Sequence, residues 1–187
     1  SALTKNEIDL TNLGTYATFQ INPIKRLRLS ASLRYDRFEY NHRNFLTPSS
    51  FSGSPNASST FDAITPKLGF TYDLNNNRGI YANFAQGFVP PQVGELYRGV
   101  QVPTLDASVY NNYEVGGWYS FRLSDRLQGY GNIAFYQVNA TNQIISVQLD
   151  DGTRENRNAG EPESRGVEYM LSINNSKQLQ YRWSGSF

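Results

Sequence analysis

The sequence of 187 residues has no cysteine, one methionine and one histidine. Without cysteine it forms no disulfide bridge and no thiolate metal site, and a lone histidine is a poor basis for a metal centre. The charges nearly balance, because the sequence has 17 Lys and Arg and 16 Asp and Glu. The cations are scattered rather than clustered, so the sequence gives no sign of nucleic-acid binding. No apolar stretch approaches the ~20 residues of a membrane helix, and no glycine-rich phosphate loop or nucleophile–base motif is present.

What the sequence does have is alternation of apolar and polar side chains, from about Asn12 to the end. A period of two gives a strand one apolar and one polar face. No window repeats apolar residues at the helical spacing of three and four, so we expect essentially no helix. The eight alternating runs are Leu13–Ile21, Leu27–Asp36, Ile64–Leu74, Ile80–Gly87, Tyr113–Leu123, Leu127–Tyr136 (extendable through Ile144 and Val147), Val167–Ile173 and Leu179–Phe187.

The connections between these runs alternate in length. Those after the first, third, fifth and seventh runs are short turns, whereas those after the second, fourth and sixth are long and polar. We place the long loops at about Glu39–Ala63, Gln92–Asn112 and Asp150–Ser164. This pattern is typical of an antiparallel meander that crosses a membrane as a β-barrel. A mean hydropathy of −0.55 agrees with it, because barrel strands are only half apolar.

The chain resembles part of the β-barrel of TonB-dependent outer-membrane receptors. Four stretches carry the resemblance in the family's order: the "NxGxYA…RLxL…RYDxF" pattern in 12–38, the "PxxGxxY…YANFAQGFxPP" pattern in 66–91, the "NYExG" strand in 112–116 and the "NAGE…SRGVE" pattern in 158–168. Each motif is weak by itself, and the four together cover about Asn12 to Phe187.

The resemblance implies an all-β up-and-down meander of about eight strands within a barrel of ~22 strands. It also implies a Gram-negative outer-membrane protein that is not an enzyme, needs no cofactor, and takes up a scarce solute, ferric siderophore first. The family's plug domain, which contacts TonB, is missing from residues 1–187. We therefore expect a segment truncated at both ends. The aromatic end at Phe187 instead resembles the last strand of outer-membrane proteins.

Two sets of residues are candidates for function. In the second run we expect Leu27, Leu29, Ala31, Leu33 and Tyr35 to face lipid. Charges on the polar faces would then line the lumen, either paired across strands within the wall, which is our expectation, or contacting plug and solute. These are Arg28, Arg34, Asp36, Lys67, Asp73, Glu114, Arg122, Glu168 and Arg182. For Glu114 and Glu168 we expect a structural role rather than catalysis, and for His42 no metal ligation.

The second set lies in the predicted long loops. Arginine and tyrosine suit an anionic, partly aromatic ligand such as a ferric siderophore, through charge, hydrogen bonding and stacking. The candidates are Tyr97, Arg98, Tyr110, Arg154 and Arg157. Alternatively, these five are ordinary polar loop residues that do not contact a ligand.

Two other functions stay open. A passive outer-membrane channel would share the barrel but lack a plug and TonB contact. A soluble all-β module, such as a carbohydrate-binding sandwich, would bury its apolar faces against each other instead of leaving them for outer-membrane lipid. Dependence on detergent would separate this module from both barrels.

Overall fold

The computed structural model describes residues 4–148, 150, 152, 154–175 and 179–187. It confirms an all-β antiparallel meander. Eight strands form one sheet in the order β1-β2-β3-β4-β5-β6-β9-β10, and β7 and β8 form a separate hairpin. The strands are β1 (Asn6–Ile24), β2 (Leu27–Asn44), β3 (Ala57–Asn75), β4 (Arg78–Val89), β5 (Ser108–Ser124), β6 (Leu127–Thr141), β7 (Gln143–Gln148), β8 (Arg154–Gly160), β9 (Glu163–Asn175) and β10 (Leu179–Ser186).

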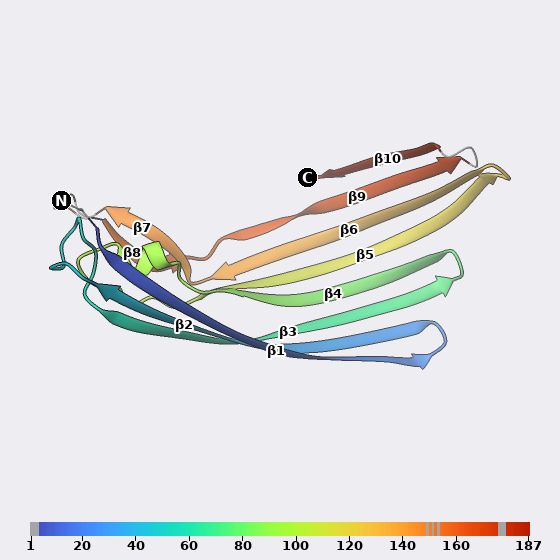
Figure 1. Ribbon diagram of the computed structural model, residues 1–187. Helices are drawn as coiled ribbons and strands as arrows, with labels where there is room; N and C mark the ends of the chain where they lie inside the picture. The colour runs from blue at the N-terminus through green and yellow to red at the C-terminus, as the bar shows by residue number, and fades with distance from the viewer. Residues whose placement is uncertain (1–3, 149, 151, 153, 176–178) are drawn as a thin grey trace.

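The eight strands of the sheet run lengthwise beside one another (Figure 1). The tight connections gather at one end, which we call the turn end. The long connections and the β7–β8 hairpin gather at the other, the loop end. Within the part of the chain described, β1 and β10 are the two edges of the sheet, so the sheet is open.

The register between strands brings the apolar runs onto one face of the sheet. Leu29 pairs with Ile21 on one side and with Phe70 on the other. Phe70 in turn pairs with Ala82, and Ala82 with Val115. Beyond β5, Val115 pairs with Phe135, Phe135 with Val167, and Leu171 with Trp183. Because directly opposed residues share a face, the predicted apolar face of each run is part of one continuous surface.

The two faces differ in how enclosed they are. We call the face that carries Leu29 and Ala31 the outer face and the opposite one the inner face. Many large apolar side chains on the outer face are exposed, among them Leu33 (53%) and Phe135 (60%). On the inner face Asp36, Thr65, Ala134 and Ser172 are buried although the sheet is open. The inner face is therefore the more sheltered side of the sheet.

Three predicted loops are shorter than expected because the strands run past the amphipathic segments. β2 continues to Asn44 and β3 begins at Ala57, so residues 45–56 alone connect them. β5 begins at Ser108, and β8 occupies much of the third predicted loop. Backbone ladder hydrogen bonds hold a strand together whether or not one face is apolar, so alternation marks only part of each strand.

Two further details depart from the expectation. Thr141 ends β6, and Asn142 adopts a positive φ of 57°, so the Ile144–Val147 extension forms the separate strand β7. The one helix among the described residues, α1 (Val93–Tyr97), lies in the connection between β4 and β5. Its first turn is closed by the Gln92 backbone N–H, which donates to the Glu95 carboxylate at 2.6 Å. Five residues are too few for an amphipathic period to be seen. No helix in the described residues has the length and apolar character to cross a membrane.

Candidate functional site

The outer face changes from apolar to polar near the loop end, just beyond Tyr35. From Leu27 to Tyr35 the outward positions of β2 are apolar or aromatic, and the next outward positions are Arg37, Glu39, Asn41 and Arg43. Eight residue steps in a strand tilted by ~40° span roughly 20 Å, close to the apolar band of an outer-membrane barrel. The sequence therefore sets the upper edge of this band between Tyr35 and Arg37.

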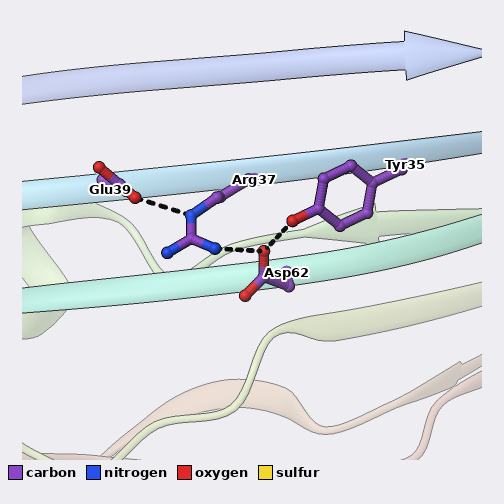
Figure 2. A network of polar contacts seen from close by, with 4 residues as sticks. All are labelled: Tyr35, Arg37, Glu39 and Asp62. Atoms are coloured by element: carbon purple, nitrogen blue, oxygen red, sulfur yellow. Dashed lines mark hydrogen bonds and ion pairs between the residues drawn. The ribbon is translucent and has the colours of Figure 1, made fainter.

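A polar network on the outer face lies at this edge (Figure 2). Arg37 donates through Nε to Glu39 at 2.7 Å, and its guanidinium lies 3.8 Å from the Asp62 carboxylate. Tyr35 donates its hydroxyl to Asp62 at 2.6 Å. The bond to Glu39 is the main reason that the pKa of Arg37 is raised. The three charged side chains are 42–48% exposed, so the network marks a hydrated boundary rather than a ligand pocket.

At the same level along the strands, the inner face changes from charged to aromatic side chains. Phe38, Tyr40 and His42 follow the charged Arg34 and Asp36 along it. Tyr40 packs with residues of the β4–β5 connection into a core of buried side chains that we call the mouth cluster: Tyr40, Leu96, Tyr97 and Leu105. Phe38, Ala57, Phe61, Val93, Val102 and Ile144 pack around it. Burial is the main cause of the raised pKa of Tyr40. The connection is thus drawn onto the inner face of β2 and β3.

The centre of this contact is a stacked pair of rings. His42 and Tyr97 lie with ring centroids 4.7 Å apart and planes within 5° of parallel. His42 is 2% exposed and Tyr97 3%. The Tyr97 hydroxyl donates to Ser59 Oγ at 2.8 Å, and the Tyr97 carbonyl accepts from the Ser54 backbone N–H at 3.1 Å. His42 Nδ1 lies 3.2 Å from the carbonyl of Pro55, which can only accept, so Nδ1 carries the proton.

The other side of the same connection is held by the β7–β8 hairpin. Asn158 accepts from the Asp106 backbone N–H at 2.7 Å and donates to the carbonyl oxygens of Asp106 at 2.9 Å and Asn142 at 2.6 Å. Asn156 donates to the carbonyl of Glu95 at 3.0 Å. Asn158 is the first residue of the "NAGE" motif, and Asn156 lies two residues before it in the same strand, β8. The motif therefore has a local role in joining two long connections.

A hollow of about 570 Å³ opens beside α1, between the start of β1 and the 45–56 loop. Its lining mixes a cation, an exposed aromatic ring and small polar groups: Thr4, Asn6, Ile8, Ser50, Phe51, Ser52, Gly53, Val93, Gly94, Tyr97 and Arg98. Arg98 is exposed and makes no hydrogen bond or ion pair with the described residues. A second hollow, of about 580 Å³, is lined almost wholly by apolar side chains of the outer face, including Phe19 and Phe70. Of these two hollows, the first has the chemistry to hold a polar solute.

The five ligand candidates are not gathered in one place. Tyr97 and Arg98 meet at the first hollow, although Tyr97 is buried and uses its hydroxyl within the fold. The expectation of a loop position is wrong for Tyr110, which lies within β5 of the main sheet. Arg154 and Arg157 lie in β8, a strand of the separate hairpin that connects β6 with β9 at the loop end. Arg157 is paired with Glu155 at 2.6 Å. Sequence reasoning missed His42, Ser59, Asn156 and Asn158, whose contacts join residues tens of positions apart.

The register places the predicted lumen charges together on the inner face: Arg28, Arg34, Asp36, Lys67, Asp73, Glu114, Arg122, Glu168 and Arg182. Among the described residues, no ion pair between strands joins two of these nine charges, contrary to the expectation of such pairs. One pair forms on this face, within β2, where Arg34 binds Asp36 through two bonds of 2.6 and 2.7 Å. Neighbouring inward positions are mostly Ser, Asn, Gly or Tyr, so opposite charges rarely face one another across a ladder.

Comparison with known proteins decides the family. The family model described as TonB dependent receptor-like, beta-barrel, matches residues 2–187. The chain belongs to this family. Its members are outer-membrane β-barrel proteins of Gram-negative bacteria and act as receptors and transporters, not as enzymes.

Relatives of the TonB-dependent receptor segment share modest identity with it. The rhizobactin receptor of Rhizobium meliloti (strain 1021) is 27% identical over 158 residues, 78% of this chain and 19% of that receptor. The ferric-pyoverdine 358 receptor of Pseudomonas putida is 33% identical over 113 residues, 58% of this chain and 13% of that receptor. The chain thus spans about a fifth or less of the length of these relatives.

Solved structures show the same fold. The hemophore receptor HasR of Serratia marcescens, solved with HasA and heme, has a TM-score of 0.76 at 15% identity, covering 95% of this chain and 34% of that one. The siderophore receptor PiuA of Acinetobacter baumannii has a TM-score of 0.62 at 20% identity, covering 97% and 26%. At such identities the likeness concerns the fold alone.

Proposed function

We propose that this chain is a segment of a longer outer-membrane receptor that takes up a ferric siderophore. In this proposal the outer face of the sheet contacts outer-membrane lipid, the inner face lines the lumen, and the loop end faces the cell exterior. The single observation that carries the orientation is the change of side chains on both faces of β2 at the edge of the apolar band. Beyond Tyr35 the outer face becomes charged while the inner face gains Phe38, Tyr40 and His42. These two changes are expected where a strand leaves the lipid bilayer and enters water.

The inner face supports an occupied lumen. Arg28, Lys67, Arg122 and Glu168 are exposed there and lack an ion-pair partner among the described residues. Unpaired charges on one wall favour a polar partner inside the barrel, and a plug domain elsewhere in the receptor would supply it. Through that plug the receptor would be coupled to the TonB complex.

The hollow beside α1 supports an anionic ligand. Arg98 offers a guanidinium that no described residue engages, Phe51 is 75% exposed, and Thr4, Ser50 and Asn6 add hydroxyl and amide groups. A ferric siderophore complex presents oxygen-rich and often aromatic surface to such groups. The names of the rhizobactin and ferric-pyoverdine receptors support the same ligand class.

Uptake of ⁵⁵Fe-siderophore by cells that carry the complete receptor tests the proposal. We expect uptake that depends on TonB, and an apparent affinity about tenfold weaker or more in Arg98→Gln. Arg43→Gln is the matched control, since Arg43 is an exposed cation at the loop end of β2 that is not a ligand candidate and does not line the hollow. Uptake that persists without TonB would favour the passive channel, and equal effects of the two variants would remove Arg98 from the ligand site.

A further inference from the structure

Two adjacent rows of side chains cross the outer face of the sheet at right angles to the strands. Directly opposed residues form the row nearer the loop end, which starts at Phe19 of β1 and ends at Arg165 of β9. The other row starts at Ile21 and ends at Val167, and on every strand it lies two residues closer to the turn end. We call the space between the two rows the outer groove.

The outer groove is hollowed from β1 to β9. Over β1–β5 it contains the apolar hollow of about 580 Å³ described above, where the small Ala31 and Ala82 lie among phenylalanine rings. It continues over β5, β6 and β9 as a hollow of about 460 Å³, and Tyr113 lines both. The second hollow adds polar groups, because Gln137 and Arg165 line it. The groove is thus apolar over most of its length and polar at its β9 end.

The outer groove also runs obliquely through the apolar band. On β2, Leu33 and Tyr35 separate it from the polar Arg37, whereas on β9 Arg165 is itself the first polar residue beyond Val167. A strand tilt of ~40° explains this course, because a row at right angles to tilted strands is inclined to the membrane plane. The six strand spacings from β1 to β9, at ~4.8 Å each, then cover roughly 18 Å of depth, close to one leaflet of a ~30 Å hydrocarbon core.

The β9 end of the groove carries a cation without a partner. Arg165 is exposed and makes no hydrogen bond or ion pair with any described residue. Gln137, directly opposite, donates to Asn139 at 3.0 Å, so amides lie beside the guanidinium on β6. Glu163 is the acid on the same face of β9, one outward position closer to the loop end, and it does not pair with Arg165. An unpaired arginine next to amides suits a phosphate, which it can bind through two hydrogen bonds.

We propose that the outer groove binds one anionic lipid of the leaflet at the loop end, a lipid that carries a phosphate in its head group. The phosphate lies against Arg165 and Gln137, and one acyl chain follows the groove from β9 toward Ala31 and Phe19. Three features select this ligand: the cation at one end, the apolar lining over the rest, and the oblique course from the band edge into the leaflet. A soluble anion or a second copy of the receptor accounts for only part of them. This inference rests on the proposed function in assigning the outer face to lipid, and it makes no use of the solute.

Photo-cross-linking of the complete receptor in phosphatidylcholine vesicles tests the site. The probe is phosphatidylglycerol with a photoreactive diazirine at the end of one acyl chain. The control probe is phosphatidylcholine with the same chain, whose choline cancels the phosphate charge. We expect the first probe to label the groove on β1–β3, around Phe19, Ala31 and Leu68, at least about fivefold more than the second. Phosphatidylglycerol without the diazirine should compete for this labelling, and inorganic phosphate should not.

Two variants examine the two ends of the groove separately. Arg165→Gln should lower labelling of the groove about fivefold or more, whereas Arg43→Gln, at an exposed cation outside the groove, should leave it unchanged. Ala31→Phe fills the apolar hollow and should abolish labelling at Leu68. Leu33→Phe is its control, because Leu33 lies on the same face of β2 and does not line the groove.

The contrary outcomes are equally defined. Even labelling of the whole outer face, or equal labelling by the two probes, would show surrounding bulk lipid only and overturn the site. Labelling of the groove by neither probe would mean that protein covers it, which also overturns the proposal. If Arg165→Gln does not insert, the comparison of the two probes on the unchanged receptor decides alone. A receptor that takes up no ferric siderophore would refute the proposed solute and leave every one of these readouts intact.

Discussion

Tyr97 is expected to contribute most to holding the connection between β4 and β5, residues 90–107, on the sheet. Its ring is 3% exposed, stacks on His42 at 4.7 Å and donates a hydrogen bond of 2.8 Å to Ser59. Burial of ~150–250 Å² at ~25 cal/mol per Å² gives roughly 4–6 kcal/mol as an upper bound, and aromatic-to-alanine changes in cores typically cost ~3–5 kcal/mol. Tyr97→Phe keeps the ring and loses one hydrogen bond, for about 0.5–1.5 kcal/mol.

The measurement must report local opening, because the ladder of the sheet does not depend on this side chain. Exchange of the Ser54 amide is suitable, since that N–H donates to the Tyr97 carbonyl. A loss of ~3 kcal/mol predicts exchange more than about 100-fold faster in Tyr97→Ala, while Tyr97→Phe should change it by about tenfold or less. Similar exchange in the two variants would refute the reasoning that burial of the ring, rather than its hydroxyl, anchors the connection between β4 and β5.

The same geometry leads to three further predictions. Ala31→Arg, at the middle of the outer apolar band, should disfavour insertion into vesicles by ~2–4 kcal/mol, whereas Ser32→Arg on the inner face should be tolerated; equal losses would contradict the face assignment. Gly53→Ala should destabilise the 45–56 loop by about 1–2 kcal/mol, seen as faster proteolysis, because Gly53 has a φ of +91° and an added Cβ would meet a backbone oxygen at 2.8 Å. A double-mutant cycle of Arg37→Gln and Glu39→Gln should give a coupling of only ~0.2–1 kcal/mol in urea unfolding, and a larger value would show that this pair is shielded from water.

The sequence predicts the transmembrane part of the fold well and the loop end poorly. Alternation from Leu27 to Tyr35 places each side chain on the correct face because one face of this stretch is apolar and the other polar. Past Arg37 both faces carry polar or aromatic residues, so the pattern no longer reports that the strand continues to Asn44. The predicted strand ends, and with them the placement of Tyr110, are wrong for this reason.

The candidate site is predictable in part. The sequence identifies Arg98 as a loop cation, and Arg98 lies at a hollow of suitable chemistry. The sequence also predicts Tyr97 as a ligand contact, yet Tyr97 is buried. The large apolar side chains Leu96, Tyr97 and Leu105 in this connection are a usable signal, because large apolar side chains in loops usually cover a core. The partners His42 and Asn158 cannot be found from spacing, since those contacts join residues 55 and 52 positions apart.

The most direct test of the lipid-facing assignment is a spin-label accessibility scan along β2, with single cysteines from 27 to 43 in the complete receptor in lipid vesicles. We expect labels at the odd positions from 27 to 35 to be accessible to oxygen and shielded from a water-soluble nickel complex, with this pattern lost from Arg37 onward. Labels at Ser30 and Ser32 should show no contact with lipid. Alternation that continues unchanged to Arg43, or oxygen accessibility at Ser30 and Ser32, would contradict the assignment of the outer face to lipid and the loop end to water.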